Sequence, residues 1–277
     1  MRVELCGVRG SMPAAGAAFA RVGGNTSCVA IAHDDERHPR LLLDAGTGLR
    51  NVSRLLGGAP FHGSLVLTHL HWDHTQGLPF FTAGDRDDAL VHVHLPASGD
   101  AAHALMGLMS PPFFPITPEG LRGDWRFSAL CAGAFDAEGF EVVARRLPHP
   151  GGTNFGLRVT DGRSSLAYVP DHGPLALGPG PEGWGPYHDD VLGLVDGVDL
   201  LLHDAQLLSA ELPAKAHFGH STVDYAVELA RRAGVGRLLL FHHDPWRTDD
   251  EVDAIVRCHG GGGVEVAAAV EGQTFEL

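Results

Sequence analysis

A ten-residue stretch at positions 68–77 carries the side chains whose types and spacing most clearly point to chemistry. It reads Thr-His-Leu-His-Trp-Asp-His-Thr-Gln-Gly and follows an apolar run at residues 64–67. Imidazole and carboxylate groups suit divalent zinc, and their alternate spacing lets one loop supply two metal positions. The plainer alternative is a polar loop in a chain that holds 18 histidines. We favour a metal-binding loop, with the ligands His69, His71, Asp73 and His74.

The same arrangement, an apolar run followed by an acidic or imidazole side chain, recurs further along the chain. The side chains concerned are His149, Asp171, Asp204 and His242. His149 stands between two prolines, which fix the backbone and suit a positioned ligand better than core filling. If the strand ends gather at one edge of a sheet, these groups meet in a single shallow cleft. Functional residues commonly lie on loops that a rigid scaffold positions in this way.

Short strands and helices must position these residues. Apolar runs bounded by Gly, Pro, Asn and Asp predict strands at residues 3–8, 27–33, 40–43, 65–67, 90–95, 125–130, 140–147, 155–159, 165–169, 198–202, 238–241 and 264–268. Apolar residues at helical spacing predict helices at residues 49–56, 101–109, 223–230 and 249–258, the third capped by Ser221 or Thr222. The Gly- and Pro-dense segment 173–190 is expected to be a loop, not a domain linker.

Several other polar residues have two interpretations. Asp44 ends a strand, either as a turn aspartate before glycine or as a group that orients a metal-binding histidine. His92 and His94 alternate along a predicted strand and are interpreted as structural residues. His243 could replace the residue before it as a ligand, but neighbours at a strand end point to opposite sides. His172 is expected to be a turn residue, with contact to substrate from the cleft rim as the alternative.

Composition limits the class of protein. With 277 residues, 44% of them hydrophobic and 19% charged, the chain is expected to form one globular domain over residues 1–277. The net charge of −14 and the lack of a basic block disfavour a large polyanion, although bound metal ions would still admit small phosphate esters. No apolar run could span a membrane. The first residues do not resemble a signal peptide and the 4 cysteines are scattered, so a cytoplasmic protein is expected.

The motif and the later residues together resemble the metallo-β-lactamase superfamily over nearly the whole chain. Its hallmark His-x-His-x-Asp-His is intact at residues 69–74. The likeness is greatest to the branch of RNase Z and the phosphoribosyl cyclic phosphodiesterases, because His149, Asp171 and His242 match its later ligands and Gly-His-Ser-Thr at 219–222 resembles its proton-donor motif. The resemblance implies an α/β fold, the metallo-β-lactamase-type αββα sandwich, with two mixed sheets packed face to face and helices outside.

The resemblance also implies roles for individual residues. Two ligand sets would share a bridging carboxylate: His69, His71 and His149; Asp73, His74 and His242; and Asp171 between them. The metals would be two zinc ions, with manganese as the alternative, sharing a hydroxide that attacks phosphorus. His220, oriented by Asp204, would give a proton to the leaving alkoxide. Asp204 replaces the glutamate of the family's His-Glu-Ala-Thr segment and has a shorter reach. The implied catalytic residues are His220, Asp204 and Asp73.

The expected function is that of a metal-dependent hydrolase, a phosphodiesterase acting on small phosphodiesters such as cyclic nucleotides or cyclic ribose phosphates. Three alternatives stay open: a tRNA 3′ processing endonuclease resembling RNase Z, a thioester or lactam hydrolase, and a non-catalytic relative resembling cofactor-handling proteins of pyrroloquinoline-quinone biosynthesis. The acidic charge and the lack of a long basic insertion count against the first, and the intact ligand set with His220 against the last. The expected partner is a small phosphodiester, not a membrane or a large nucleic acid; a homodimer stays open.

Overall fold

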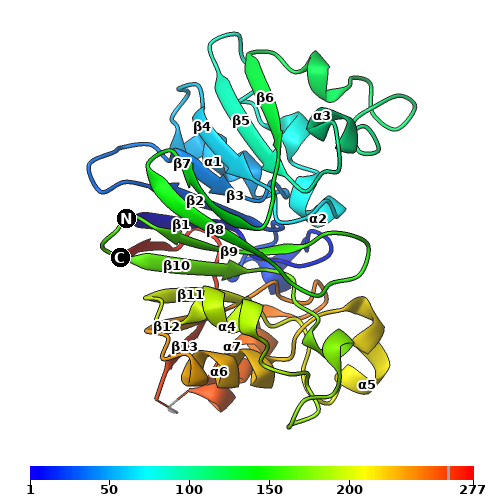
Figure 1. Ribbon diagram of the computed structural model, residues 1–277, viewed down its shortest axis with the longest axis vertical. Helices are drawn as coiled ribbons and strands as arrows, with labels where there is room; N and C mark the ends of the chain where they lie inside the picture. Colours follow the sequence, from blue (N-terminus) through cyan, green and yellow to red (C-terminus); the bar gives the residue numbers. More distant parts are fainter. Residues whose placement is uncertain (261–262) are drawn as a thin grey trace.

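The chain folds into two seven-stranded sheets that lie face to face in the computed structural model, which describes residues 1–260 and 263–277 (Figure 1). The first sheet has the strand order β14, β1, β2, β3, β4, β5, β6. β1 and β3 run antiparallel to β2, and β3 to β6 run parallel to one another. The bounds are β1 (Arg2–Gly7), β2 (Cys28–Ala32), β3 (Leu41–Leu43), β4 (His62–Val66), β5 (Leu90–Leu95), β6 (Asp124–Ala129) and β14 (Thr274–Glu276).

The second sheet has the strand order β13, β12, β11, β10, β9, β8, β7. β8 and β10 run antiparallel to β9, and β10 to β13 run parallel to one another. The bounds are β7 (Gly133–Ala137), β8 (Phe140–Arg146), β9 (Phe155–Thr160), β10 (Ser165–Val169), β11 (Leu200–Asp204), β12 (Arg237–Phe241) and β13 (Glu265–Ala268).

These directions decide where the polar strand ends lie. Because β8 and β10 are both antiparallel to β9, the strands β8, β10, β11 and β12 all end at one edge of the second sheet. By the same argument β1, β3 and β4 end at one edge of the first sheet. The single sheet edge expected from the sequence is therefore wrong: the strand ends of interest come from two sheets that meet.

Alternating side chains form the core between the sheets. Val29 and Ile31 of β2 face the inter-sheet core together with Leu200 and Leu202 of β11, whereas Ala30 and Leu201 face outward under the helices. Strands buried on both faces carry nearly continuous apolar runs. This explains why the central strands were predictable from short apolar segments alone.

Helices cover the outer faces: α1 and α3 lie against the first sheet and α4, α6 and α7 against the second (Figure 1). The α-helices are α1 (Leu49–Leu55), α2 (Trp72–Thr75), α3 (Ala101–Ala104), α4 (Asp189–Val195), α5 (Leu212–Lys215), α6 (Val223–Arg232) and α7 (Asp249–His259). Short 3₁₀ turns are η1 (Ala17–Phe19), η2 (Leu78–Phe80), η3 (Pro118–Gly120), η4 (Pro174–Leu177) and η5 (Ala216–Phe218). Among the described residues, no helix is both long and apolar enough to cross a membrane.

The predicted αββα sandwich of two mixed sheets with helices outside is confirmed. Several elements differ from the sequence prediction: β7 and β14 are additional edge strands, α5 is an additional short helix, and α4 begins inside the segment expected to be a loop. β7 and β14 are largely exposed, so they lack the apolar pattern that marks a strand. The helix predicted at 101–109 ends at Ala104, and Thr222 rather than Ser221 caps α6 by accepting a hydrogen bond from the Tyr225 N–H.

Candidate active site

The motif loop begins where β4 ends and contains one turn of helix, α2, in place of the continuous loop expected. His71 is the residue before α2, and Asp73 and His74 lie in its first turn. Successive residues of a helix point about 100° apart, because a turn takes 3.6 residues. As a result Asp73 and His74 are buried while Trp72 between His71 and Asp73 is 74% exposed.

The first ligand cluster joins this loop to the loop after β8. Its donor atoms belong to His69, His71, His149 and Asp171 and all lie within 4.8 Å of one another. His149 Nε2 lies 3.2 Å from His71 Nδ1 and 3.3 Å from Asp171 Oδ2. The other nitrogen of His149, Nδ1, donates to the Gly219 carbonyl at 2.9 Å, so the lone pair of Nε2 faces the cluster.

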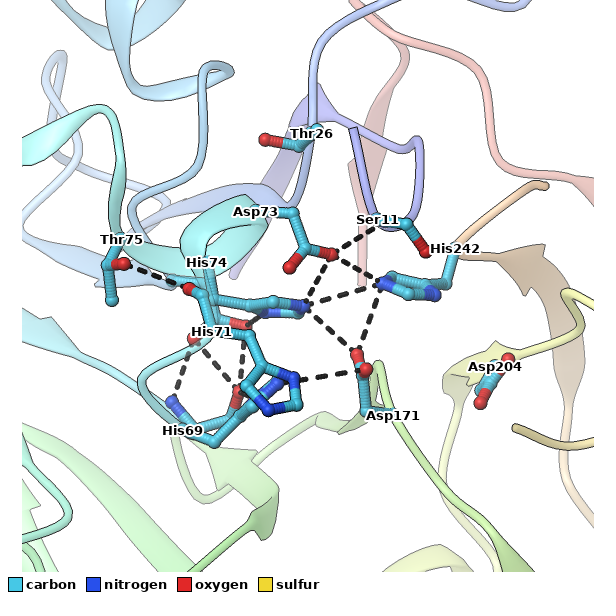
Figure 2. A network of polar contacts seen from close by, with 12 residues as sticks. Ser11, Thr26, His69, His71, Asp73, His74, Thr75, Asp171, Asp204 and His242 are labelled. Atoms are coloured by element: carbon cyan, nitrogen blue, oxygen red, sulfur yellow. Dashed lines mark hydrogen bonds and ion pairs between the residues drawn. The ribbon is translucent and has the colours of Figure 1, made fainter. Parts of the chain in front are cut away.

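The second ligand cluster contains Asp73, His74 and His242. His242 Nε2 lies 3.0 Å from Asp73 Oδ2 and 3.2 Å from Asp171 Oδ1, and His74 Nε2 lies 3.0 Å from the same Asp171 oxygen. Figure 2 shows these four side chains pointing toward one another, with Asp171 facing both clusters. The structure thus brings together all seven predicted ligands, while their binding of metal stays a prediction.

The donor set fits metal cations. His69 Nε2 and His242 Nδ1 are buried and have no hydrogen-bond partner in the described part of the chain. Burial and the neighbouring His74 lower the pKa of His69, and burial lowers the pKa of His71 and His149, which favours the neutral imidazole that metal binding requires. A bound cation would satisfy His69 Nε2.

The carboxylates create a strongly negative field at the second cluster. Burial alone would lower the pKa of His74, but the charges of Asp73, Asp171 and Asp44 raise it well above its ordinary value. The pKa of Asp171 moves the opposite way: burial opposes ionisation, yet His242, His74 and His69 hold it well below its usual range. A field that favours a proton on a buried imidazole also favours a metal ion.

Asp44 stands directly behind His74. Its Oδ2 accepts from His74 Nδ1 at 2.7 Å and from the Tyr168 hydroxyl at 2.9 Å, and its Oδ1 accepts from the Thr68 backbone N–H at 2.8 Å. Of the two interpretations of Asp44, the structure supports the one in which it orients a histidine. Such partners fix the tautomer and direction of the ring.

His220 lies beside the clusters and is paired with Asp204. The Nδ1 of His220 donates to Asp204 Oδ2 at 3.0 Å, and that oxygen also accepts from the backbone N–H groups of His172 and Ser221. Burial opposes a proton on His220, but the charge and hydrogen bond of Asp204, followed by the charges of Asp171 and Asp73, raise the pKa of His220 to about 9. His220 is 8% exposed and is protonated at neutral pH.

The positions of three further histidines can be compared with the roles expected from the sequence. His243 points away from the clusters and its Nε2 donates to the Ala269 carbonyl at 2.9 Å, in agreement with the preference for His242. His92 lies in the middle of β5 and forms a hydrogen bond with the Ser128 hydroxyl at 2.8 Å, in agreement with a structural role. The suggestion that His172 touches substrate from the rim is wrong, because its side chain is fully buried between His188 and His203.

Ser11 is a site residue that the sequence did not reveal. Its backbone N–H donates to Asp73 Oδ2 at 2.7 Å, and its hydroxyl accepts from the Gln206 amide at 2.9 Å. The segment that holds Ser11 is rich in Gly, Ala and Pro and has no ligand pattern. The one signal that points to Ser11 is its position shortly after β1, which ends at the same sheet edge as β3 and β4. The preceding Gly10 is required by packing, since a Cβ there would lie 2.4 Å from His242 Nδ1.

Strained backbone accompanies the site. Ser11, Asp44 and His242 have φ angles of 62°, 58° and 58°, the left-handed region that side chains other than glycine rarely adopt. Such conformations persist where the surrounding structure fixes them and concentrate at functional sites. Each of the three aims a side chain or N–H group into the clusters or directly behind them.

Two cavities open beside the clusters and share Leu70 and His71. One, of about 360 Å³, is lined by Ser11, Leu70, His71, Trp72, Asp73, Asp171 and His220. The other, of about 370 Å³, extends from His69 and His71 toward the loops after β5, β6 and β8. Asp171 and His220 therefore line the same cavity, which is large enough for a small compound.

Comparison with known proteins gives the family. The model of a beta-lactamase superfamily domain matches residues 39–243. A ribonuclease Z from Bradyrhizobium sp. is 30% identical over 291 residues, which cover 84% of this chain and 92% of that protein.

Solved structures show the same fold. The metallo-beta-lactamase fold protein YhfI from Bacillus subtilis superposes with a TM-score of 0.70 at 20% identity, covering 99% of this chain and 98% of that one. Zn(2+)-bound PqqB from Methylobacterium extorquens superposes with a TM-score of 0.69 at 18% identity, covering 100% of both chains. The chain therefore belongs to the metallo-β-lactamase superfamily of metal-dependent hydrolases, in the branch that contains ribonuclease Z.

Proposed function

We propose that the chain is a phosphodiesterase that hydrolyses small, cyclic or otherwise compact phosphodiesters. The observation that carries this proposal is the His220–Asp204 pair, which lies beside the ligand clusters and places His220 in the same cavity wall as Asp171. An alkoxide is a poor leaving group until it is protonated, so a positioned acid accelerates its departure.

Two metal ions, zinc with manganese as the alternative, would be held by the residues that the structure brings together. The first would bind His69, His71 and His149, the second Asp73, His74 and His242, and Asp171 would contact both. When bound, such ions supply an activated water at neutral pH and offset the negative charge of the phosphodiester. Asp44 and the Gly219 carbonyl keep His74 and His149 turned toward the site.

The protein's own residues handle the proton. Asp204 accepts from His220 Nδ1, and no partner for Nε2 is found among the described residues. This leaves the Nε2–H free to reach a substrate in the cavity that His220 lines. In the proposed reaction His220 gives this proton to the departing ester oxygen, and the Asp204 carboxylate stabilises the imidazolium until then.

A second candidate function is the cleavage of precursor tRNA, which the 30% identity to a ribonuclease Z favours. Large nucleic acids are bound mainly through Lys and Arg contacts to phosphates. The chain has a net charge of −14, with 20 basic residues against 34 acidic ones, and no basic block. We therefore rank a small diester above a tRNA.

A substrate panel tests the proposal. Purified wild type and His220→Ala are assayed with bis-p-nitrophenyl phosphate, cyclic mononucleotides, a base-free cyclic ribose phosphate, a precursor tRNA and nitrocefin. We expect the small diesters to be hydrolysed fastest, and the cyclic compounds to need His220. Cleavage of nitrocefin with no diester hydrolysis would overturn the proposal, and faster cleavage of the tRNA would favour the second candidate. Metal analysis should find about two ions per chain; one ion would contradict the two-metal site.

A further inference from the structure

Trp72 is an exposed aromatic side chain placed inside the motif itself. Its neighbours His71 and Asp73 turn into the clusters, whereas the indole is 74% exposed. It lines the cavity of about 360 Å³ that also contains Asp171 and His220. A large apolar group at this place is exposed to water at a cost, because burying such a side chain is favourable.

The indole ring of Trp72 makes no stacking contact, whereas its backbone is held by hydrogen bonds. Among the described residues it contacts no aromatic ring or cation, whereas Trp125 stacks near Phe127 with ring centroids 6.2 Å apart. The backbone of Trp72 is held on both sides, because its carbonyl accepts from the Gln76 N–H at 2.8 Å and the His71 carbonyl accepts from the His74 N–H at 3.0 Å. The ring is therefore presented to the cavity from a rigid support, the arrangement that lowers the entropy cost of binding.

We propose that Trp72 is a platform on which a planar ring of the substrate, a nucleobase, stacks while the phosphodiester lies against the ligand clusters. This inference rests on the proposed function and selects among its substrates: a cyclic nucleotide would use the indole, and a base-free cyclic ribose phosphate would not. Bases stack on aromatic side chains with little regard to base identity, since every base has a π-face. Leu70 lines the same cavity and adds apolar surface beside the indole.

The test compares Trp72→Ala and Trp72→Phe with a matched control, Trp246→Ala. Trp246 is 77% exposed and does not line this cavity. For adenosine 3′,5′-cyclic phosphate we expect Trp72→Ala to lower kcat/KM by about 5- to 100-fold, mainly through KM, the range that loss of base stacking produces. Trp72→Phe should keep most of the activity, Trp246→Ala all of it, and hydrolysis of the base-free compound should be unchanged in all three variants.

A binding measurement gives a second readout. Adenosine 5′-monophosphate added to the wild type should quench tryptophan fluorescence, and the quenching should be lost in Trp72→Phe but kept in Trp246→Ala. Equal losses of kcat/KM on both substrates in Trp72→Ala, a fall in its metal content, or a change in its oligomeric state on size-exclusion chromatography would each overturn the inference, because Trp72 would then support the ligands or a subunit contact. If the wild type hydrolyses neither substrate, the proposed function fails, and the inference with it.

Discussion

Two aspartate–histidine pairs lie behind the site, one in each half of the chain. In the N-terminal half, Asp44 follows β3 and accepts from His74 Nδ1 at 2.7 Å; in the C-terminal half, Asp204 ends β11 and accepts from His220 Nδ1 at 3.0 Å. Both aspartates are fully buried and also accept backbone N–H groups. In each pair the carboxylate accepts from Nδ1 and so turns Nε2 of the ring toward the site.

The two pairs differ in what surrounds Nε2 of the histidine. His74 is fully buried, and its Nε2 lies 3.0 Å from Asp171 Oδ1 and 3.2 Å from Asp73 Oδ2. His220 lines an open cavity. A carboxylate behind an imidazole therefore does not decide whether the ring serves as a ligand or as an acid. The groups in front of the ring decide it.

The strongest test removes Asp171, the carboxylate that both histidines approach. Asp171→Ala should lose metal and reduce kcat/KM on the order of 10³-fold or more, because in the proposed site both ions and the water they would activate depend on it. Metal analysis and hydrolysis of bis-p-nitrophenyl phosphate measure the two effects. Asp136→Ala, at an exposed position of β7, is the control and should behave as wild type. A variant with full metal content and activity would show that Asp171 is not shared.

The next test asks whether His220 is an acid or a metal ligand. The question arises because potential ligand atoms of His220, Asp171 and His242 lie within 4.8 Å of one another. His220→Ala should lower kcat by about 10²- to 10³-fold for an alkoxide leaving group, as expected for loss of a general acid. Hydrolysis of bis-p-nitrophenyl phosphate should change little, because p-nitrophenolate leaves without a proton. Metal content should stay constant; a loss of metal would make His220 a ligand and remove the difference between the two pairs.

Asp44→Asn perturbs the buried pair. It should weaken metal affinity by about 10- to 100-fold, the usual effect of losing a carboxylate behind a metal-binding histidine. Competition with a chelator measures the affinity, and excess zinc should restore activity. Tyr168→Phe removes a neutral partner of the same Asp44 oxygen and should have a smaller effect. If Asp204→Asn weakens metal binding equally, the two pairs do the same work.

The smallest effect is expected in the pH profile of Asp204→Asn. The donor must carry a proton, so kcat of the wild type should fall as pH rises through the pKa of His220, which the charges of Asp204, Asp171 and Asp73 raise to about 9 against the effect of burial. Removing the Asp204 charge lowers that pKa and moves the basic limb to lower pH. Asp44→Asn serves as the comparison and should keep the limb where it is. If kcat falls at the same basic pH in the wild type, Asp204→Asn and Asp44→Asn, His220 is not the titrating acid.

The two halves also differ in how much of them could be predicted from sequence. The N-terminal ligands lie within six residues, so their types and spacing sufficed to predict a metal-binding loop. The C-terminal residues are isolated, and their meeting depends on strand directions: β8, β10, β11 and β12 end at one edge because β9 runs against its neighbours. Apolar runs predict such strands, but not which sheet they join.

What the sequence could not predict has physical reasons. Ser11 acts through its backbone N–H, which any residue type supplies, so no side-chain pattern marks it. α4 follows a Gly- and Pro-dense passage and contains a glycine, and Asp44 before Gly46 resembles an ordinary turn. The role of Asp44 in orienting His74 depends on the parallel pairing of β3 and β4, which brings the two residues together.

The buried imidazoles behind Asp204 form a chain with one direction. Since the Asp204 carbonyl can only accept, His203 carries its proton on Nδ1 and accepts at Nε2 from His172 Nδ1, and His172 Nε2 in turn accepts from His188 at 3.0 Å. Burial lowers the pKa of His172 and His203, which keeps both neutral. His188 closes the Gly- and Pro-rich passage before α4, so lifting this end would leave a buried imidazole unpaired at a cost of about 1–3 kcal/mol. The hydrogen bond to His172 therefore anchors the C-terminal end of this passage to the buried residues behind Asp204.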